Sequence, residues 1–174
     1  RLVEVRDPLG VTAVVRRDGA GLPVRLETGG GGRYVDVTYA GTRVALVRDH
    51  AGREVSYAYE GDLLASVTKP DGATWGYAYD EQGRLCGVVD PAGRWRLRQS
   101  YDAHGRVARQ RLAGQGEDTF SYATDSTTHE SARSGHEAFA QDEQGRTTEV
   151  RRGPFCERYT YTARNLWEGR LDGA

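Results

Sequence analysis

The sequence contains no methionine and only two cysteines. Without an initiator methionine, we expect the chain to be a segment of a longer protein. Cys86 and Cys156 are far apart and form no CxxC pair, so neither a disulfide framework nor a cysteine metal site is expected. Both cysteines are interpreted as small apolar side chains in strands.

Apolar residues are scarce as well. Hydrophobic residues make up 37% of the sequence and the mean hydropathy is −0.69, whereas glycine accounts for 23 of the 174 residues. This composition favours many turns and a thin apolar layer over a thick core. No apolar run approaches the roughly 20 residues of a transmembrane helix, and nothing resembles a signal peptide.

The formal net charge is −1, and Lys69 is the only lysine among 24 cationic residues. A nucleic-acid-binding protein usually needs a clustered positive face. The charge balance therefore argues against a nucleic-acid partner, and no cofactor is predicted.

The sequence repeats with a period of 20 to 22 residues. Tyrosines recur at Tyr39, Tyr59, Tyr79, Tyr101 and Tyr122. Glycines keep the same spacing at Gly10, Gly31, Gly52, Gly72, Gly93, Gly114 and Gly135. Because two residue types share one period, the chain is interpreted as an array of internal repeats.

Two of the repeats carry a recognisable motif. Tyr79-Asp80-x-x-Gly83-Arg84-Leu85 is followed by Tyr101-Asp102-x-x-Gly105-Arg106-Val107, and a later copy at 142–146 ends in Gly145-Arg146. These motifs resemble the YD repeats of the Rhs family, which includes bacterial polymorphic toxins, shell subunits of insecticidal toxin complexes, and teneurins. The resemblance divides the chain into about eight repeats over residues 1–161 and an irregular end, or the start of a further repeat, over 162–174.

Runs of apolar and β-branched residues alternate with glycine-centred turns about ten residues apart, which predicts an all-β antiparallel meander of hairpins with almost no helix. The predicted strands are 2–6, 12–17, 22–27, 33–39, 43–48, 53–59, 63–68, 74–79, 84–89, 95–101, 106–112, 118–122, 127–131, 136–140, 146–151 and 157–162. The resemblance implies that this meander forms a curved or spiralling sheet, part of a β shell.

The turns have a physical basis. In Asp90-Pro91-Ala92-Gly93 proline starts the turn, whereas in the turn that begins at Asp80 the aspartate side chain caps it. We predict positive φ angles at Gly83 and Gly105. The repeat tyrosines are assigned a structural role, holding neighbouring strands in register.

Candidate reactive residues are few. No nucleophile and base share a motif, so His50, His104, His129 and His136 are interpreted as non-catalytic, and a metal site built on His129 and His136 is not favoured. Rhs proteins often cleave themselves with aspartates in a DPxG region, but the tetrapeptides at 7–10 and 90–93 are interpreted as hairpin turns. The glycine run at 29–32 is interpreted as a loose loop, since no phosphate-binding signature follows it.

The resemblance implies a function. Rhs shells enclose a C-terminal toxin, so the expected role is a structural piece of shell wall without catalysis, in an exported bacterial effector. Sixteen strands at about 4.8 Å span roughly 75 Å, about half of the circumference needed around a toxin domain. The expected partners are the rest of the shell and the enclosed toxin, with a secretion adaptor or immunity protein as further candidates. The alternative is a recognition module that binds glycans or a protein through exposed aromatic residues such as Trp75, Trp95 and Trp167.

Overall fold

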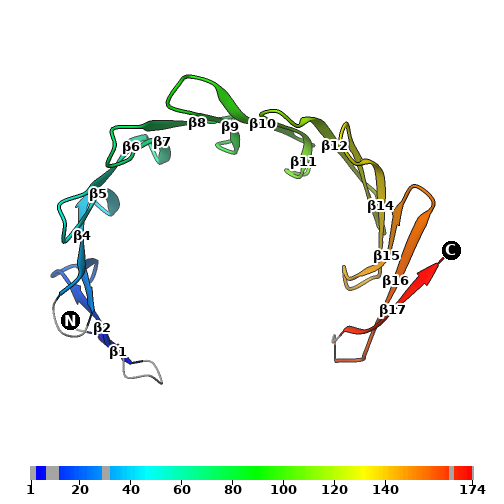
Figure 1. The fold of residues 1–174 in the computed structure, drawn as a ribbon, viewed down its shortest axis with the longest axis horizontal. Helices are drawn as coiled ribbons and strands as arrows, with labels where there is room; N and C mark the ends of the chain where they lie inside the picture. The colour runs from blue at the N-terminus through cyan, green and yellow to red at the C-terminus, as the bar shows by residue number, and fades with distance from the viewer. Residues whose placement is uncertain (1–2, 7–11, 29–31, 165–166, 174) are drawn as a thin grey trace. The chain divides into compact units, whose positions relative to one another are not determined.

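A computed structural model describes residues 3–6, 12–28, 32–164 and 167–173, and their regular structure consists of β-strands alone (Figure 1). The strands are β1 (Val3–Arg6), β2 (Thr12–Arg17), β3 (Pro23–Thr28), β4 (Tyr34–Ala40), β5 (Arg43–Asp49), β6 (Glu54–Glu60), β7 (Leu63–Thr68), β8 (Thr74–Tyr79), β9 (Leu85–Val89), β10 (Trp95–Tyr101), β11 (Val107–Leu112), β12 (Gly116–Tyr122), β13 (Ser126–Ser131), β14 (Gly135–Gln141), β15 (Thr147–Arg152), β16 (Phe155–Tyr161) and β17 (Trp167–Gly173). Among the described residues, no helix is long and apolar enough to cross a membrane.

Strands that follow one another in sequence pair with one another. Antiparallel registers run from β1 through β8 and from β10 through β17. The chain forms two compact units, one of residues 1–84 with 88–94 and the other of residues 85–87 with 95–174. The predicted all-β antiparallel meander is confirmed.

Few side chains of the sheet are buried. Val150, 6% exposed, is the only buried hydrophobic side chain of the described residues. Most strand residues are half-buried or exposed, as the low hydrophobic content predicted. A layer this thin places much of the stabilisation in backbone pairing and in side-chain contacts between neighbouring strands.

Positive φ angles occur where the turn chemistry requires them. Gly83 and Gly105 have φ angles of 75° and 79°, as predicted. The other repeat glycines with positive φ are Gly52, Gly72, Gly93, Gly114, Gly135 and Gly145. Gly10, Gly31 and the predicted turns at 7–10 and 29–31 lie outside the described residues.

The C-terminal part contains one strand more than the sixteen predicted. This strand, β17, pairs with β16 from Cys156↔Gly173 to Tyr161↔Trp167. The connection to β17 has the same five-residue length as the aspartate turns. The sequence obscured β17 because Thr162 and Asn165 stand where those turns have aspartate and glycine.

Candidate functional site

The repeated structural unit begins with an aspartate turn. Five turns have the sequence Asp-x-x-Gly-Arg, starting at Asp49, Asp80, Asp90, Asp102 and Asp142. In the last of them, Asp142 Oδ1 accepts hydrogen bonds from the backbone N–H groups of Gln144 and Arg146, both at 3.0 Å. Its other oxygen, Oδ2, accepts a hydrogen bond from Arg146 Nε at 2.7 Å. One carboxylate therefore closes the turn and fixes the arginine that follows it.

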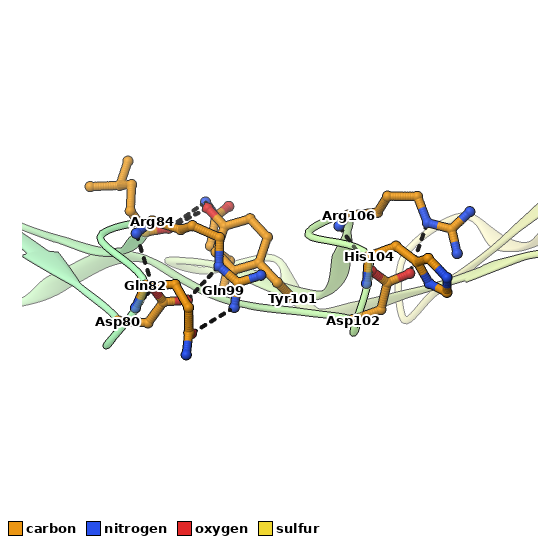
Figure 2. Close-up of polar contacts among 9 residues, drawn as sticks. Asp80, Gln82, Arg84, Gln99, Tyr101, Asp102, His104 and Arg106 are labelled. Atoms are coloured by element: carbon orange, nitrogen blue, oxygen red, sulfur yellow. Dashed lines mark hydrogen bonds and ion pairs between the residues drawn. The ribbon is translucent and has the colours of Figure 1, made fainter.

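Figure 2 shows the same arrangement in two further turns. Asp102 Oδ1 accepts from the backbone of His104 at 2.8 Å and of Arg106 at 2.9 Å, and Arg106 Nε donates to Oδ2 at 2.8 Å. Asp80 bonds Arg84 in the same way. In each turn, glycine occupies the left-handed position and donates its N–H to the aspartate carbonyl.

These contacts keep the aspartates ionised. The pKa of the side chain lies below its ordinary value in all five turns. At Asp142 the backbone N–H of Arg146 lowers the pKa most, and the guanidinium of Arg146 lowers it further. At Asp102 partial burial raises the pKa, but the hydrogen bonds from Arg106 and His104 outweigh that effect.

Tyrosine hydroxyls form the second part of the unit. Each donates to a backbone carbonyl on the preceding strand, over 2.6 to 3.0 Å. The pairs are Tyr39 with Pro23, Tyr59 with Val44, Tyr79 with Leu64, Tyr101 with Leu85, Tyr122 with Val107 and Tyr161 with Thr147. We call this contact the tyrosine latch.

The latch connects two strands beyond the end of their backbone pairing. Backbone pairing between β11 and β12 runs from Leu112↔Gly116 to Arg109↔Thr119 and stops there. The hydroxyl of Tyr122 then bridges to the carbonyl of Val107, at 2.7 Å. The latch therefore holds two strands together at the end where their ladder has stopped.

Each latch also reaches the irregular position of the preceding repeat. A register shift lies between Ser100 and Tyr101, where Tyr101 pairs with Val107, and Val107 is the residue whose carbonyl Tyr122 binds. In the same way, Tyr39 pairs with Val44 beside a register shift, and the hydroxyl of Tyr59 binds the carbonyl of Val44. Because a bulge interrupts the ladder locally, its carbonyls need other partners, and the next tyrosine supplies one.

The repeat at Gln141 has no latch. Gln141 stands where a tyrosine would lie, and β13 and β14 pair along their full length, from Ser131↔Gly135 to Ser126↔Ala140. The backbone N–H of Gln141 donates to the carbonyl of Asp125 at 2.7 Å. Since this strand pair does not open, it does not need the hydroxyl.

The turn arginine and the next tyrosine are in contact. The guanidinium of Arg106 lies 4.2 Å from the ring centroid of Tyr122, and that of Arg146 lies 4.9 Å from Tyr161. An ordered guanidinium over a tyrosine face is a favourable cation–π contact. In these two turns, aspartate, arginine, tyrosine and carbonyl thus form one chain of contacts from the turn into the next repeat.

Residues 60–94 match the RHS repeat family model, and they contain the aspartate turns that start at Asp80 and Asp90. This segment is similar to an RHS repeat. The resemblance of the sequence to the Rhs and YD-repeat family is confirmed by this match. No curated protein matches the chain.

Solved structures share the fold of this chain. The crystal structure of TcdB2-TccC3-Cdc42 superposes with a TM-score of 0.70 at 15% identity, over 90% of this chain and 10% of that chain. A Photorhabdus luminescens Tc holotoxin pore with a mutated TccC3 gives a TM-score of 0.67 at 16% identity, over 93% of this chain and 10% of that chain. The chain therefore spans about a tenth of the length of these neighbours.

The histidines of the chain are not brought together. His129 and Glu137 are partners across β13 and β14, and His136 is the partner of Glu130. Since adjacent strand residues point to opposite faces, His129 and His136 project from opposite faces. No group of three metal-ligating side chains occurs in the part of the chain that the structure describes.

His129 has a local structural environment. Its ring stacks on Phe120 with centroids 4.8 Å apart, and its nitrogens lie 3.4 Å from Glu137 Oε2 and 3.7 Å from Asp118 Oδ1. No nucleophile accompanies it in these contacts. Of the other two histidines, His50 and His104 both lie in aspartate turns.

The DPxG tetrapeptide that starts at Asp90 is a hairpin turn, as predicted. Asp90 Oδ1 accepts from the backbone of Ala92 and of Arg94, both at 3.0 Å, and its side chain is only 5% exposed. The equivalent tetrapeptide at 7–10 lies outside the described residues. Cys86 and Cys156 are free thiols.

Sequence reasoning missed two parts of this site. Tyr161 was not included among the repeat tyrosines, although it falls two periods after Tyr122 with Gln141 between them. The arginine of the turn was noted but given no role. Its position four residues after the aspartate in all five Asp-x-x-Gly-Arg turns was the available signal.

Proposed function

We propose that this chain is a structural segment of an Rhs-type β shell that encloses a C-terminal toxin polypeptide and helps to deliver it. The observation that carries the proposal is the tyrosine latch, repeated in six places along a meander of consecutive strands. Each latch ties one repeat to the one before it, so repeats can be added without a thick core.

A wall of this kind has particular physical requirements. It must be one sheet thick and keep its register over many strands, because a slip of one residue exchanges its two faces. The aspartate turns fix the hairpins, and the latches fix the opened ends of the strand pairs. The shared fold with chains of Tc toxin structures supports the proposal.

The proposal includes partners and location. The chain would contact the rest of its own shell and the enclosed toxin, in an effector made in the cytoplasm of a bacterium and then exported. A secretion adaptor or an immunity protein is a further candidate partner. We propose that the chain has no catalysis of its own, because its carboxylates and tyrosines are engaged in turns and latches.

Limited proteolysis of the full-length gene product tests enclosure. We expect the polypeptide downstream of the shell region to resist protease in the intact protein. The same polypeptide expressed without the shell region should be cleaved rapidly. Equal cleavage rates in the two forms would count against an enclosing shell.

A recognition module is the second candidate, and exposed aromatic residues favour it. Trp95 is 43% exposed and Trp167 is 63% exposed. The two lie on β10 and β17, with six strands between them in the meander, and therefore do not form one aromatic strip. A glycan array probed with the fluorescent chain would detect such binding, and a specific signal lost in Trp95→Ala or Trp167→Ala would favour this function.

A further inference from the structure

The arginines of β10 and β11 differ from most others in the chain. Most described arginines pair with carboxylates, as in the five aspartate turns and the cross-strand pairs such as Arg16–Glu27. Within the described residues, no carboxylate lies within salt-bridge distance of the guanidinium of Arg98 or Arg111, and both side chains are exposed, although Glu117 on β12 is the register partner of Arg111. Only Arg109 of the same strand pair lies near a carboxylate, 3.6 Å from Glu117.

Arg98 and Arg111 also lie directly opposite each other. They are register partners across β10 and β11, so both side chains project from the same face. The Cβ atoms of such partners are about 5 Å apart, and like charges in this position destabilise a sheet. The fold itself gains nothing from this pair of charges.

Trp95 orders one member of the pair. The guanidinium carbon of Arg98 lies 4.9 Å from the centroid of the Trp95 ring. The ring lies over Gly87, where a Cβ atom would come within 2.2 Å of Trp95 Cζ3. Because Gly87 has no side chain, Trp95 can occupy this position and hold Arg98 by a cation–π contact.

The three residues border two depressions in the surface. One, of about 380 Å³, is lined by Trp95, Arg98 and Arg111 together with Arg109, Glu117 and uncharged residues, and the second, of about 370 Å³, shares Trp95, Arg98 and Arg111. All of them belong to one compact unit of the chain. A ligand at this place would therefore meet the guanidinium groups of Arg98 and Arg111 and one aromatic face, beside the Arg109–Glu117 pair.

We propose that Trp95, Arg98 and Arg111, the arginine-pair surface, bind the carboxylates of an acidic polypeptide segment. The planar guanidinium fork matches a carboxylate in two parallel hydrogen bonds, and two adjacent forks match two acidic side chains. Carboxylates are the partners of arginine throughout this chain. Nucleic acid fits less well, since it requires an extended positive face and the chain has a net charge of −1. This proposal does not depend on the shell function.

Fluorescence anisotropy with fluorescein-labelled octaglutamate tests the proposal on the 174-residue chain. We expect binding that weakens as salt is added, and about a tenfold loss of affinity in the double variant Arg98→Gln/Arg111→Gln. The matched control is Arg133→Gln/Arg164→Gln, which removes the same charge from two exposed turn residues. The control should change the affinity by less than about twofold.

The alternatives give distinct results. Octaglutamate binding that is equal in the wild type and the Arg98→Gln/Arg111→Gln variant would overturn the proposal. The proposal would also be overturned if a single-stranded DNA octamer bound more tightly than octaglutamate and lost its affinity in the same variant. The surface would then be a phosphate site. Octaserine should not bind.

A substitution that keeps every charge provides an independent test. Gly87→Ala places a methyl group where the Trp95 ring lies, so the ring must move and Arg98 loses its support. We expect weaker octaglutamate binding together with a change in Trp95 fluorescence. The control is Gly76→Ala, where the nearest atom to the new Cβ is Val89 Cβ at an ordinary 3.8 Å. Equal binding by the two alanine variants would show that Trp95 does not position Arg98.

Discussion

At the scale of single residues, glycine is required in the aspartate turns by the backbone and not by packing. Gly83 has a φ of 75°, and a Cβ atom there would meet only Leu63, at 3.8 Å. We expect Gly83→Val to lower the free energy of unfolding by about 1–2 kcal/mol, because a β-branched residue is strained in the left-handed region. Urea denaturation followed by circular dichroism measures the loss.

Two variants serve as controls for that prediction. Gly83→Asn should cost less, since asparagine tolerates positive φ better than other residues. Gly19→Val introduces the same side chain at a turn glycine without a positive φ and with no atom within 4 Å. If Gly19→Val is as destabilising as Gly83→Val, the cost does not come from the turn conformation.

The tyrosine latch gives a second prediction at this scale. Tyr122→Phe removes only the hydroxyl that binds the carbonyl of Val107, while the ring remains under Arg106. We expect a loss of about 0.5–1.5 kcal/mol, the usual net value of one hydrogen bond. Thermal denaturation compares it with Tyr57→Phe, whose hydroxyl donates to no described residue. Equal stability of Tyr122→Phe and the wild type would contradict the latch.

At the scale of elements, the carboxylates of the turns predict sensitivity to acid. The pKa of each turn aspartate is depressed in the folded chain, and Arg151 and Arg158 lower the pKa of Glu149 on β15 to about 2. A depressed pKa stabilises the fold above the unfolded value, near 4 for Asp and Glu, and this contribution disappears as the pH falls through the folded value. We therefore expect the melting temperature to fall as the pH drops from about 5 to 2.

Single variants should separate the contributions of individual carboxylates to this loss of stability in acid. Asp142→Asn and Glu149→Gln should each be less stable than the wild type at pH 7 and lose less stability on acidification. Glu143→Gln, on an exposed turn position, is the control and should follow the wild-type pH curve. Differential scanning fluorimetry between pH 2 and 7 would record all four curves. Parallel curves for the wild type and Asp142→Asn would contradict the role of the turn carboxylate.

The strands could be predicted because turn motifs recur at regular intervals along this sequence. The spacing of Asp and Gly located β9 and β10 to within one residue of Leu85–Val89 and Trp95–Tyr101. Bulges could not be predicted, since an extra residue such as the one beside Tyr101 changes the pairing without changing the composition. The latch depends on these bulges, so the sequence indicated that the tyrosines were structural but not which carbonyl each one binds.

At the scale of the whole chain, the repeats end in strands with one described partner each. β1 pairs with β2, and β17 pairs with β16. The last predicted strand is 157–162, because Thr162 and Asn165 obscure the turn that follows it, and the structure adds a final strand at Trp167–Gly173. Exposed edge strands offer backbone groups to other chains.

We therefore predict that the isolated chain associates through its edge strands. Size-exclusion chromatography with light scattering at tens of micromolar should show oligomers, because a repeat array cut from its neighbours leaves unpaired strands at its ends. Trp167→Lys places a charge on β17 and should shift the chain towards monomer. The matched control is Phe155→Lys, whose side chain is 73% exposed but which lies on β16, a strand that pairs with both β15 and β17, and it should leave the oligomers unchanged. A stable wild-type monomer would show that the chain is a self-contained domain and would favour the recognition module over the shell. If the two lysine variants have equal effects, the association comes from exposed apolar side chains and not from the edge strand.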